Sequence, residues 1–306
     1  MAIWTEKVFV IAEVGPNHDG YIDNAIDIVA AVAQSGADAV KFQTFVSGET
    51  VVSNSTPLAP YMERAGAVGD QNDLHEQLGL TPDEFWLISK ECAKQNITFL
   101  STPFDISSVE LLHRLQVPLL KVPSGELTNP FLLQAIARTG LDLIVSTGMA
   151  SLEEVEAALS IIQGIWQEMC SVGTQMPALI LLQCTSAYPA PLAEVNLRAM
   201  DTLRETFNLP VGYSDHTIGR LAPIMAVALG AQVIEKHVTP NPQLAGPDHK
   251  ASLPLAELPN LVREIRQAEQ VLGVESKALT ASEKEVRSVA RRSLAVACDV
   301  HAGQSF

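Results

Sequence analysis

The feature that most constrains the fold is a short apolar run that recurs eight times, each time closing on polar side chains. The eight predicted strands are residues 8–12, 39–45, 98–104, 119–124, 143–148, 179–185, 212–217 and 234–239. Helical segments lie between or after them, among them residues 22–35, 82–94, 152–166, 195–207, 221–230 and 254–272. Continuous apolar runs are typical of strands covered on both faces. Eight strands with intervening helices over about 270 residues predict an α/β fold, the (β/α)8 TIM barrel.

The alternative architecture is an open, doubly wound sheet, but no glycine-rich dinucleotide fingerprint follows the first strand. Polar residues at the strand ends favour the barrel, whose C-terminal mouth gathers groups that would cost about 1–3 kcal/mol each if buried without partners. These residues are Glu13, Lys41, Gln43, Ser101, Thr102, Lys121, Ser124, Ser146, Thr147, Gln183, Thr185, Ser214, His216, Glu235 and His237. The sequence therefore predicts a site at this mouth.

Composition narrows the class of protein. The net charge of −15 argues against non-specific binding to nucleic acid or to an acidic membrane. The four cysteines show no disulfide-type or metal-type spacing. No secretory signal opens the chain, and no apolar run approaches the ~20 residues that span a bilayer. We expect a soluble cytoplasmic protein that binds neither nucleic acid nor membrane.

Two segments do not fit a simple barrel. Residues 46–80 are too long for an ordinary connection, and we expect either a mobile loop over the mouth, with a helical turn near Met62, or an inert insertion. Residues 1–285 are assigned to the barrel. Residues 286–306 are expected to be a linker and the first strand of a truncated second domain.

Two histidines stand at the ends of the last two predicted strands. A helix joins these strands, so they run parallel and His216 and His237 can converge on one point. Two imidazoles with nearby carboxylates favour a divalent-metal site with positions open for water and substrate. The alternative is that each imidazole only hydrogen-bonds a backbone carbonyl at the barrel rim.

Two lysines stand inside apolar strands, where a charge is rarely buried without a role. Lys41 and Lys121 could be fixed cations for phosphate and carboxylate, or one could be a Schiff-base nucleophile. Hydroxyl and backbone donors at Ser124, Ser146 and Thr147 suit an oxyanion. Together with a metal, this set favours an anionic, phosphorylated substrate.

Nine motifs in order give the chain a specific resemblance. They are IAEVGPNHDG, GADAVKFQTF, FLSTPFD, KVPSGE, IVSTGM, QCTSAYPAP, GYSDHT, EKH and GPDHKASL. Over about residues 8–305 the chain resembles the N-acetylneuraminate (sialic acid) synthase family. The resemblance implies a barrel enzyme that condenses phosphoenolpyruvate with an N-acylated hexosamine, typically N-acetylmannosamine, and releases phosphate. It also implies Mn²⁺ or Mg²⁺, and a homodimer in which a C-terminal antifreeze-like domain, here expected to be largely missing, covers the partner's mouth.

The resemblance also implies residue roles. His216 and His237 would bind the metal, and Glu13, Glu126 and Glu235 would join them as catalytic residues. The phosphoenolpyruvate site would comprise Lys41, Thr102, Lys121, Ser124, Ser146, Tyr188 and Ser214. The sugar would face Glu13, Gln43, Phe104, Tyr188 and Asp248. Ser186 stands where some members have an asparagine at the phosphoenolpyruvate site, so that contact would be lost or bridged by water.

Three alternatives remain open from the sequence. The GPDHKASL stretch accompanies synthases that act on N-acetylmannosamine or on a 2,4-diacetamido sugar, so a legionaminic- or pseudaminic-type synthase is one alternative. A Schiff-base barrel aldolase using Lys121 is the second. The third is a non-catalytic barrel that lacks its lid domain.

Overall fold

Eight parallel strands form the centre of the molecule. The structure, a computed structural model, describes residues 7–46, 57–58, 62–63, 69–170 and 176–305. The strands are β1 (Phe9–Glu13), β2 (Ala39–Thr44), β3 (Thr98–Pro103), β4 (Leu119–Val122), β5 (Asp142–Ser146), β6 (Leu179–Cys184), β7 (Val211–Asp215) and β8 (Val233–Thr239). They pair in the order β3-β2-β1-β8-β7-β6-β5-β4, and the end strands β3 and β4 lie against each other. The sheet is thus a nearly closed barrel, and the predicted (β/α)8 fold is confirmed.

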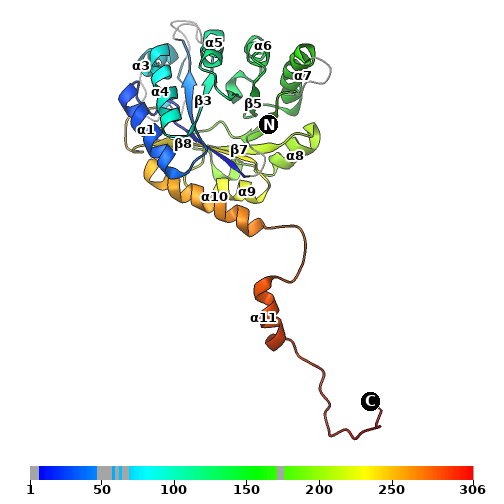
Figure 1. The fold of residues 1–306 in the computed structure, drawn as a ribbon. Helices are drawn as coiled ribbons and strands as arrows, with labels where there is room; N and C mark the ends of the chain where they lie inside the picture. The colour runs from blue at the N-terminus through cyan, green and yellow to red at the C-terminus, as the bar shows by residue number, and fades with distance from the viewer. Residues whose placement is uncertain (1–6, 47–56, 59–61, 64–68, 171–175, 306) are drawn as a thin grey trace. The chain divides into compact units, whose positions relative to one another are not determined.

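Helices surround the strands (Figure 1). They are α1 (Ile22–Ser35), α3 (Gln71–Leu78), α4 (Pro82–Lys94), α5 (Ile106–Arg114), α6 (Pro130–Arg138), α7 (Leu152–Met169), α8 (Ala199–Phe207), α9 (Leu221–Ala228) and α10 (Leu258–Leu272). Helices α8 and α10 each begin four residues later than predicted. A 3-10 turn, Leu192–Glu194, precedes α8, and a short strand, β9 (Leu253–Pro254), pairs with β8 before α10. Further 3-10 turns are Ser124–Glu126, His249–Ala251 and Leu255–Glu257.

Side chains alternate between the two faces of each strand, and this alternation builds the site. One face points into the barrel, where nine residues form an apolar inner cluster: Phe9, Ile11, Ala39, Leu100, Leu119, Ile144, Ile180, Leu182 and Val233. The other face packs against the helices in the larger core. Continuing the inner face along β1 and β8 by two residues at a time leads from Ile11 to Glu13 and from Val233 to Glu235 and His237. The barrel is therefore filled with apolar side chains at its start and with polar ones at its C-terminal mouth.

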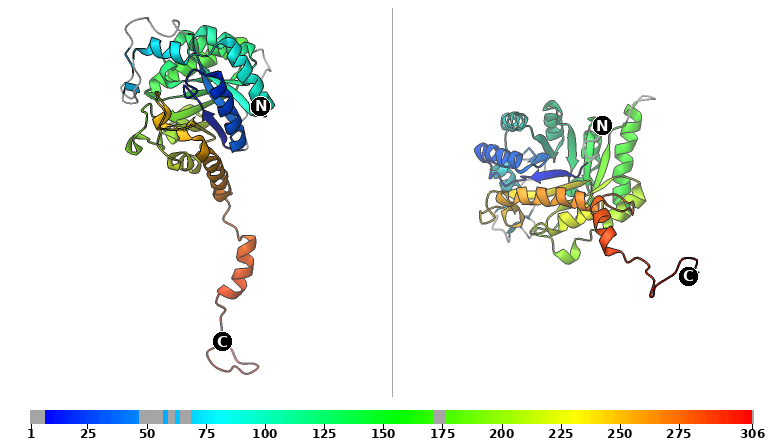
Figure 2. Two further views of the ribbon diagram at one scale, coloured as in Figure 1. Left: turned by 90° about the vertical axis from the view of Figure 1, so that its left-hand side faces the viewer. Right: turned by 60° about the horizontal axis from the view of Figure 1, so that its bottom comes forward.

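Helix α10 closes the fold onto the first strand. Arg266 pairs with Asp38 at 2.7 Å and donates to the carbonyl of Val8 at 2.6 Å. Glu269, one turn further on, accepts the backbone N–H of Val8 at 2.6 Å. Figure 2 shows α10 beside α1 in both views. The two ends of the barrel sequence are thus joined through partly buried backbone and charged groups.

The long segment after β2 is only partly described. Helix α3 lies in the part where a loop was expected, and Asp70 caps it by accepting from the N–H groups of Asn72 and Asp73. Met62 and Glu63 are helical, as expected near Met62. The proposed cover over the mouth falls largely on residues 47–56, 59–61 and 64–68, which lie outside the described residues.

The chain divides into two compact units, Met1–Val271 and Leu272–Phe306. The second holds the helix α11 (Ala281–Ala290), which spans the predicted domain boundary at residue 285. Residues 291–305 contain no strand, unlike the expectation for this tail, because an isolated strand has no partner for its backbone groups. The assignment of a second domain stays a prediction.

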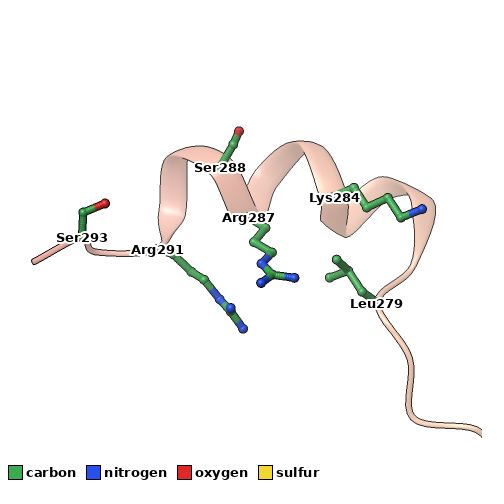
Figure 3. Close-up of a pocket in the computed structure, with 6 residues that line it drawn as sticks. All are labelled: Leu279, Lys284, Arg287, Ser288, Arg291 and Ser293. Atoms are coloured by element: carbon green, nitrogen blue, oxygen red, sulfur yellow. The ribbon is translucent and has the colours of Figure 1, made fainter.

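The second unit also carries an open pocket (Figure 3). It is lined by Leu279, Lys284, Arg287, Ser288, Arg291 and Ser293. None of these residues is among the predicted site residues. In the part of the chain that the structure describes, no helix has the length and hydropathy needed to cross a membrane.

Candidate active site

Lys41 lies at the centre of the polar layer. Its Nζ is 2.7 Å from Oε2 of Glu13 and 3.7 Å from Oε2 of Glu235, and it donates to Oγ1 of Thr102 at 2.9 Å. All four side chains are buried. Burial lowers the pKa of Lys41, but the two carboxylates outweigh it and raise the pKa above its usual value. Lys41 is therefore a fixed cation.

Lys121 provides a second buried amine. It donates to Oγ of Ser146 at 2.6 Å and to the carbonyl of Val122 at 3.0 Å. Burial lowers its pKa, and the charge of Glu235 only partly opposes this. The hydrogen-bond partners of Lys121 are thus neutral oxygens, and Glu235 is the carboxylate whose charge acts on it most strongly.

The two carboxylates of the layer are driven in opposite directions. Burial raises the pKa of Glu13 to about 7, although Lys41 opposes it. Burial alone would raise the pKa of Glu235 as well, but the charges of Lys121 and Lys41 outweigh burial and lower this pKa below its usual value. Ser214 donates to Oε1 of Glu235 at 3.0 Å. Near neutral pH, Glu13 can hold a proton while Glu235 stays ionised.

The two histidines do converge. The ring centroids of His216 and His237 are 5.4 Å apart, and the ring of Tyr188 lies 4.0 Å from the first and 5.6 Å from the second. His216 Nδ1 donates to the carbonyl of Thr185 at 2.8 Å, so Nε2 is the nitrogen that can bind a metal when the ring is neutral. Ligating histidines are commonly oriented by this kind of bond.

The charge states of the two rings differ. Burial, followed by the neighbouring His216 and lysines, lowers the pKa of His237 well below its usual value, so its imidazole is neutral. Burial alone would also lower the pKa of His216, but Cys184 and the carbonyl of Thr185 outweigh burial and raise this pKa. A neutral imidazole is the form that binds a metal.

Orphaned polar atoms beside His237 fit a bound cation. Among the described residues, His237 Nδ1 and Asp248 Oδ1 are buried without a hydrogen-bond partner, and Asp248 Oδ2 is 3.5 Å from that nitrogen. Burial raises the pKa of Asp248 to about 6. No group of three or more His, Cys, Asp and Glu side chains placed to hold an ion occurs in the described parts of the chain. The donors present fit a divalent ion whose remaining ligands are water or substrate.

Hydroxyl groups from two loops gather around Gly148. Its N–H donates to Oγ of Ser124 at 3.0 Å. A Cβ on this residue would lie 2.3 Å from Oγ of Ser186 and 2.8 Å from Oγ of Ser124, so only glycine fits. Cys184 approaches the same point and lies 3.8 Å from Nδ1 of His216. Sequence reasoning gave this buried thiol no role.

Two predicted site residues are not drawn into this network. Glu126 accepts a hydrogen bond from Asn129, the N-cap residue of α6, at 2.8 Å, so its carboxylate supports the helix start. Phe104 follows β3, and its backbone N–H donates to the carbonyl of Thr44. Gln43, in contrast, donates to Oε1 of Glu13 at 3.2 Å and belongs to the polar layer.

A histidine that sequence reasoning left unassigned ties two mouth loops together. The fully buried His249 donates from Nε2 to Oδ1 of Asp19 at 2.9 Å and accepts at Nδ1 from Oγ1 of Thr239 at 2.7 Å. It thereby connects the loop after β1 with the end of β8. Asp19 stands in the motif IAEVGPNHDG and His249 in the motif GPDHKASL.

Asn17 makes a second connection between the same loops. It donates to the carbonyl of Val238 at 2.8 Å and to Oγ of Ser252 at 2.9 Å. Ser252 donates in turn to the carbonyl of Asp248 at 2.7 Å. Asp248 is thus held at the mouth through its backbone, while its carboxylate faces His237.

The neighbouring His18 predicts a pH effect on stability. Its Nδ1 accepts the N–H of Gly20 at 3.1 Å, and burial lowers its pKa to about 4 from 6.5. Between these pH values the unfolded chain binds more protons, so this contribution is present above pH 6.5 and is lost as the pH falls through 4. His18→Asn keeps an acceptor for Gly20 but cannot titrate. We expect it to remove roughly 3 kcal/mol of the acid-induced loss of unfolding free energy, measured by urea titration at pH 7.0, 5.5 and 4.5.

Because Asn and wild type differ only in this titration, the comparison cancels the contributions of Glu13 and Asp248, whose raised pKa values act in the opposite direction. Equal pH slopes for the two proteins would contradict the assignment of a neutral His18.

The chain is similar to proteins of known activity in its sequence and its fold. Residues 28–277 match the NeuB family. The chain is 44% identical to an N,N'-diacetyllegionaminic acid synthase of Legionella pneumophila, over 96% of this chain and 82% of that protein. It is 34% identical to the N-acetylneuraminate-9-phosphate synthase of Homo sapiens, over 89% and 73%. A crystal structure of N-acetylneuraminic acid synthetase from Leptospira borgpetersenii in complex with citrate superposes with a TM-score of 0.76, at 34% identity and 94% coverage of both chains. Since its relatives include synthases of sialic-type acids and a family model matches most of its length, the chain belongs to the NeuB family.

Proposed function

We propose that this protein is a synthase that condenses phosphoenolpyruvate with an N-acylated amino sugar to give a sialic-type (nonulosonic) acid and phosphate. The observation that carries the proposal is the gathering of two buried lysines, two carboxylates of opposite pKa tendency and two converging imidazoles at one barrel mouth. Such a set binds a highly charged small anion and can also move protons.

The anionic substrate is held by the lysines and by the hydroxyl groups near them. Lys121 and Lys41 neutralise the carboxylate and phosphate of phosphoenolpyruvate, and Ser124, Ser146 and the N–H of Gly148 supply hydrogen bonds. No lysine is required as a Schiff-base nucleophile, because C3 of phosphoenolpyruvate is itself the carbon nucleophile.

The carboxylates divide the proton transfers. C3 of phosphoenolpyruvate attacks the aldehyde carbon of the open-chain sugar, and Glu13, which can be protonated near pH 7, donates to the oxygen that becomes an alcohol. Water then adds at C2, and the ionised Glu235 accepts its proton. The C2–O bond to the phosphate group then breaks while the new C2 hydroxyl becomes the ketone carbonyl, its proton passes to the departing phosphate, and inorganic phosphate leaves. Carboxyl groups with pKa values driven apart are suited to such a division.

His216 and His237 would hold a divalent ion, Mn²⁺ or Mg²⁺, with Asp248 beside them. When bound, this ion supplies Lewis-acid polarisation of the sugar's aldehyde oxygen. The hydrogen bond from His216 to Thr185 and the burial of His237 keep the two rings in place for this role. A homodimer and a cytoplasmic location, expected from the sequence, stay predictions.

The relatives favour one acceptor sugar. Identity is 44% to the diacetyllegionaminic acid synthase and 34% to the N-acetylneuraminate-9-phosphate synthase. We therefore propose the 2,4-diacetamido sugar as the preferred acceptor, with N-acetylmannosamine as the second candidate.

The test is phosphate release from phosphoenolpyruvate with a panel of sugars. We expect release only when phosphoenolpyruvate, a suitable sugar and Mn²⁺ are all present, with the highest kcat/KM for the diacetamido sugar. Phosphoenolpyruvate labelled with ¹⁸O at the bridging position should pass the label to phosphate, since the C–O bond breaks. Phosphate release without a sugar, or binding of phosphoenolpyruvate without turnover on any sugar, would contradict the proposal; the second result would favour the non-catalytic barrel.

The lowered pKa of Lys121 favours one competing function, a Schiff-base aldolase. Borohydride treatment in the presence of pyruvate, whose ketone can form an imine with a lysine, distinguishes the two. The synthase leaves the mass of the chain unchanged, whereas an aldolase is trapped as a covalent adduct on Lys121 that persists in the presence of a chelator.

A further inference from the structure

An ion pair lies directly behind the two histidines, on the opposite face of their strands. Nζ of Lys236 is 2.6 Å from Oδ2 of Asp215, and the two side chains are 1% and 0% exposed. The strand register pairs these residues across β7 and β8. Because side chains alternate, both point toward the helices while Ser214 and Glu235 point into the barrel.

The pair also holds the backbone that follows His216. Oδ1 of Asp215 accepts the N–H of Thr217 at 2.9 Å, and Lys236 donates to the carbonyl of Thr217. The hydroxyl of Tyr213 donates to the same Oδ1 at 2.9 Å. His216 is therefore fixed on both sides along the chain, at Asp215 and at both backbone groups of Thr217.

The ion pair is also directly connected to His237 along the chain. Lys236 is the residue before His237, so its ammonium group connects the backbone of β8 to the loop that carries His216. A change in the pair would move one imidazole relative to the other. None of these hydrogen bonds involves a residue of the polar layer, although the charge of Lys236 also contributes to the lowered pKa of His237.

We propose that Asp215 and Lys236 are positioning residues that set the distance and orientation between His216 and His237 for a shared divalent ion. This inference rests on the proposed function, because it assumes that the two imidazoles bind one ion. The competing explanation is that the pair only stabilises the fold. That explanation is weak on physical grounds, because a buried ion pair is often no more stabilising than apolar residues of the same size.

The test separates position from stability. Lys236→Met leaves Asp215 buried and unpaired, and Asp215→Asn/Lys236→Met removes both charges while an amide oxygen still accepts from Tyr213 and Thr217. The control is Arg266→Met, which breaks the pair with Asp38 at the opposite end of the strands. Mn²⁺ affinity is read from the paramagnetic resonance signal of free Mn²⁺, and thermal unfolding is measured in parallel.

We expect the double variant to unfold at a higher temperature than Lys236→Met and still to bind Mn²⁺ about 10–100-fold more weakly than wild type, as is usual when groups that orient metal ligands are lost. Arg266→Met should lose stability and keep its Mn²⁺ affinity. If the double variant bound Mn²⁺ with the affinity of the wild type, the positioning role would be overturned and the proposed function would stand. Absence of Mn²⁺ binding in the wild type would overturn the metal part of the proposed function, and the inference with it.

Discussion

His237→Ala is expected to lower kcat/KM for phosphate release by about 10³-fold, because it removes one of two imidazoles that converge at the barrel mouth. Polarisation of a carbonyl by a metal contributes several kcal/mol to the transition state, and about 4 kcal/mol corresponds to this factor. The measurement is steady-state phosphate release at saturating Mn²⁺, together with Mn²⁺ affinity by paramagnetic resonance.

Two histidine variants serve as controls for this loss. His18→Asn alters another buried histidine of the same mouth that makes no contact with the polar layer among the described residues. His113→Ala alters an exposed histidine of α5. Both should keep Mn²⁺ affinity. Retention of full activity by His237→Ala, with unchanged dependence on Mn²⁺, would refute the assignment of this residue as a ligand.

Lys41→Met is expected to lower the free energy of unfolding by about 3–5 kcal/mol. The substitution leaves the buried carboxyl groups of Glu13 and Glu235 facing each other without the ammonium group that lies 2.7 Å and 3.7 Å from them. The measurement is urea unfolding at pH 7.5, where a carboxylate pair without its cation is most costly. Binding of phosphoenolpyruvate should weaken in the same variant, because one of two buried cations is gone.

A double variant and a surface variant make the result specific. Lys41→Met/Glu13→Gln removes one charge of each sign and should recover more than half of the lost stability. Lys94→Met alters a lysine whose side chain is 72% exposed and whose partner is Glu91, and its unfolding free energy should match the wild type. Equal free energies of unfolding for Lys41→Met and Lys94→Met would contradict a stabilising role for the buried network around Lys41.

The polar layer itself could be predicted from the sequence because a strand places every second side chain on one face. Lys41 and Lys121 each stand between two apolar neighbours, Glu235 and His237 stand two residues apart on one face of β8, and all four are buried. The partners within the layer could not be predicted. Glu13 and Glu235 compete for Lys41 only because β1 has β2 and β8 as its neighbours, and that order follows from barrel closure.

Two acidic residues in the quoted motifs, Asp215 and Glu126, have carboxylates whose partners lie outside the polar layer. Asp215 precedes His216, and proximity in the sequence suggested a shared site, yet its carboxylate faces the helices and binds Lys236. Glu126 has its carboxylate on Asn129, at the start of α6. In both cases the partner of the carboxylate could be identified only from the tertiary structure.

The sequence alone determined the class of fold, the end of the barrel that carries the chemistry and the residue types available there, because these depend on local periodicity and on the order of strands and helices. Only the tertiary structure decided which buried charges neutralise each other, which nitrogen of His216 is left free, and what lies behind the histidine pair. Those outcomes depend on register and distance between strands that are far apart in the chain, such as the 2.6 Å contact between Lys236 and Asp215, and local sequence patterns contain no information on such distances.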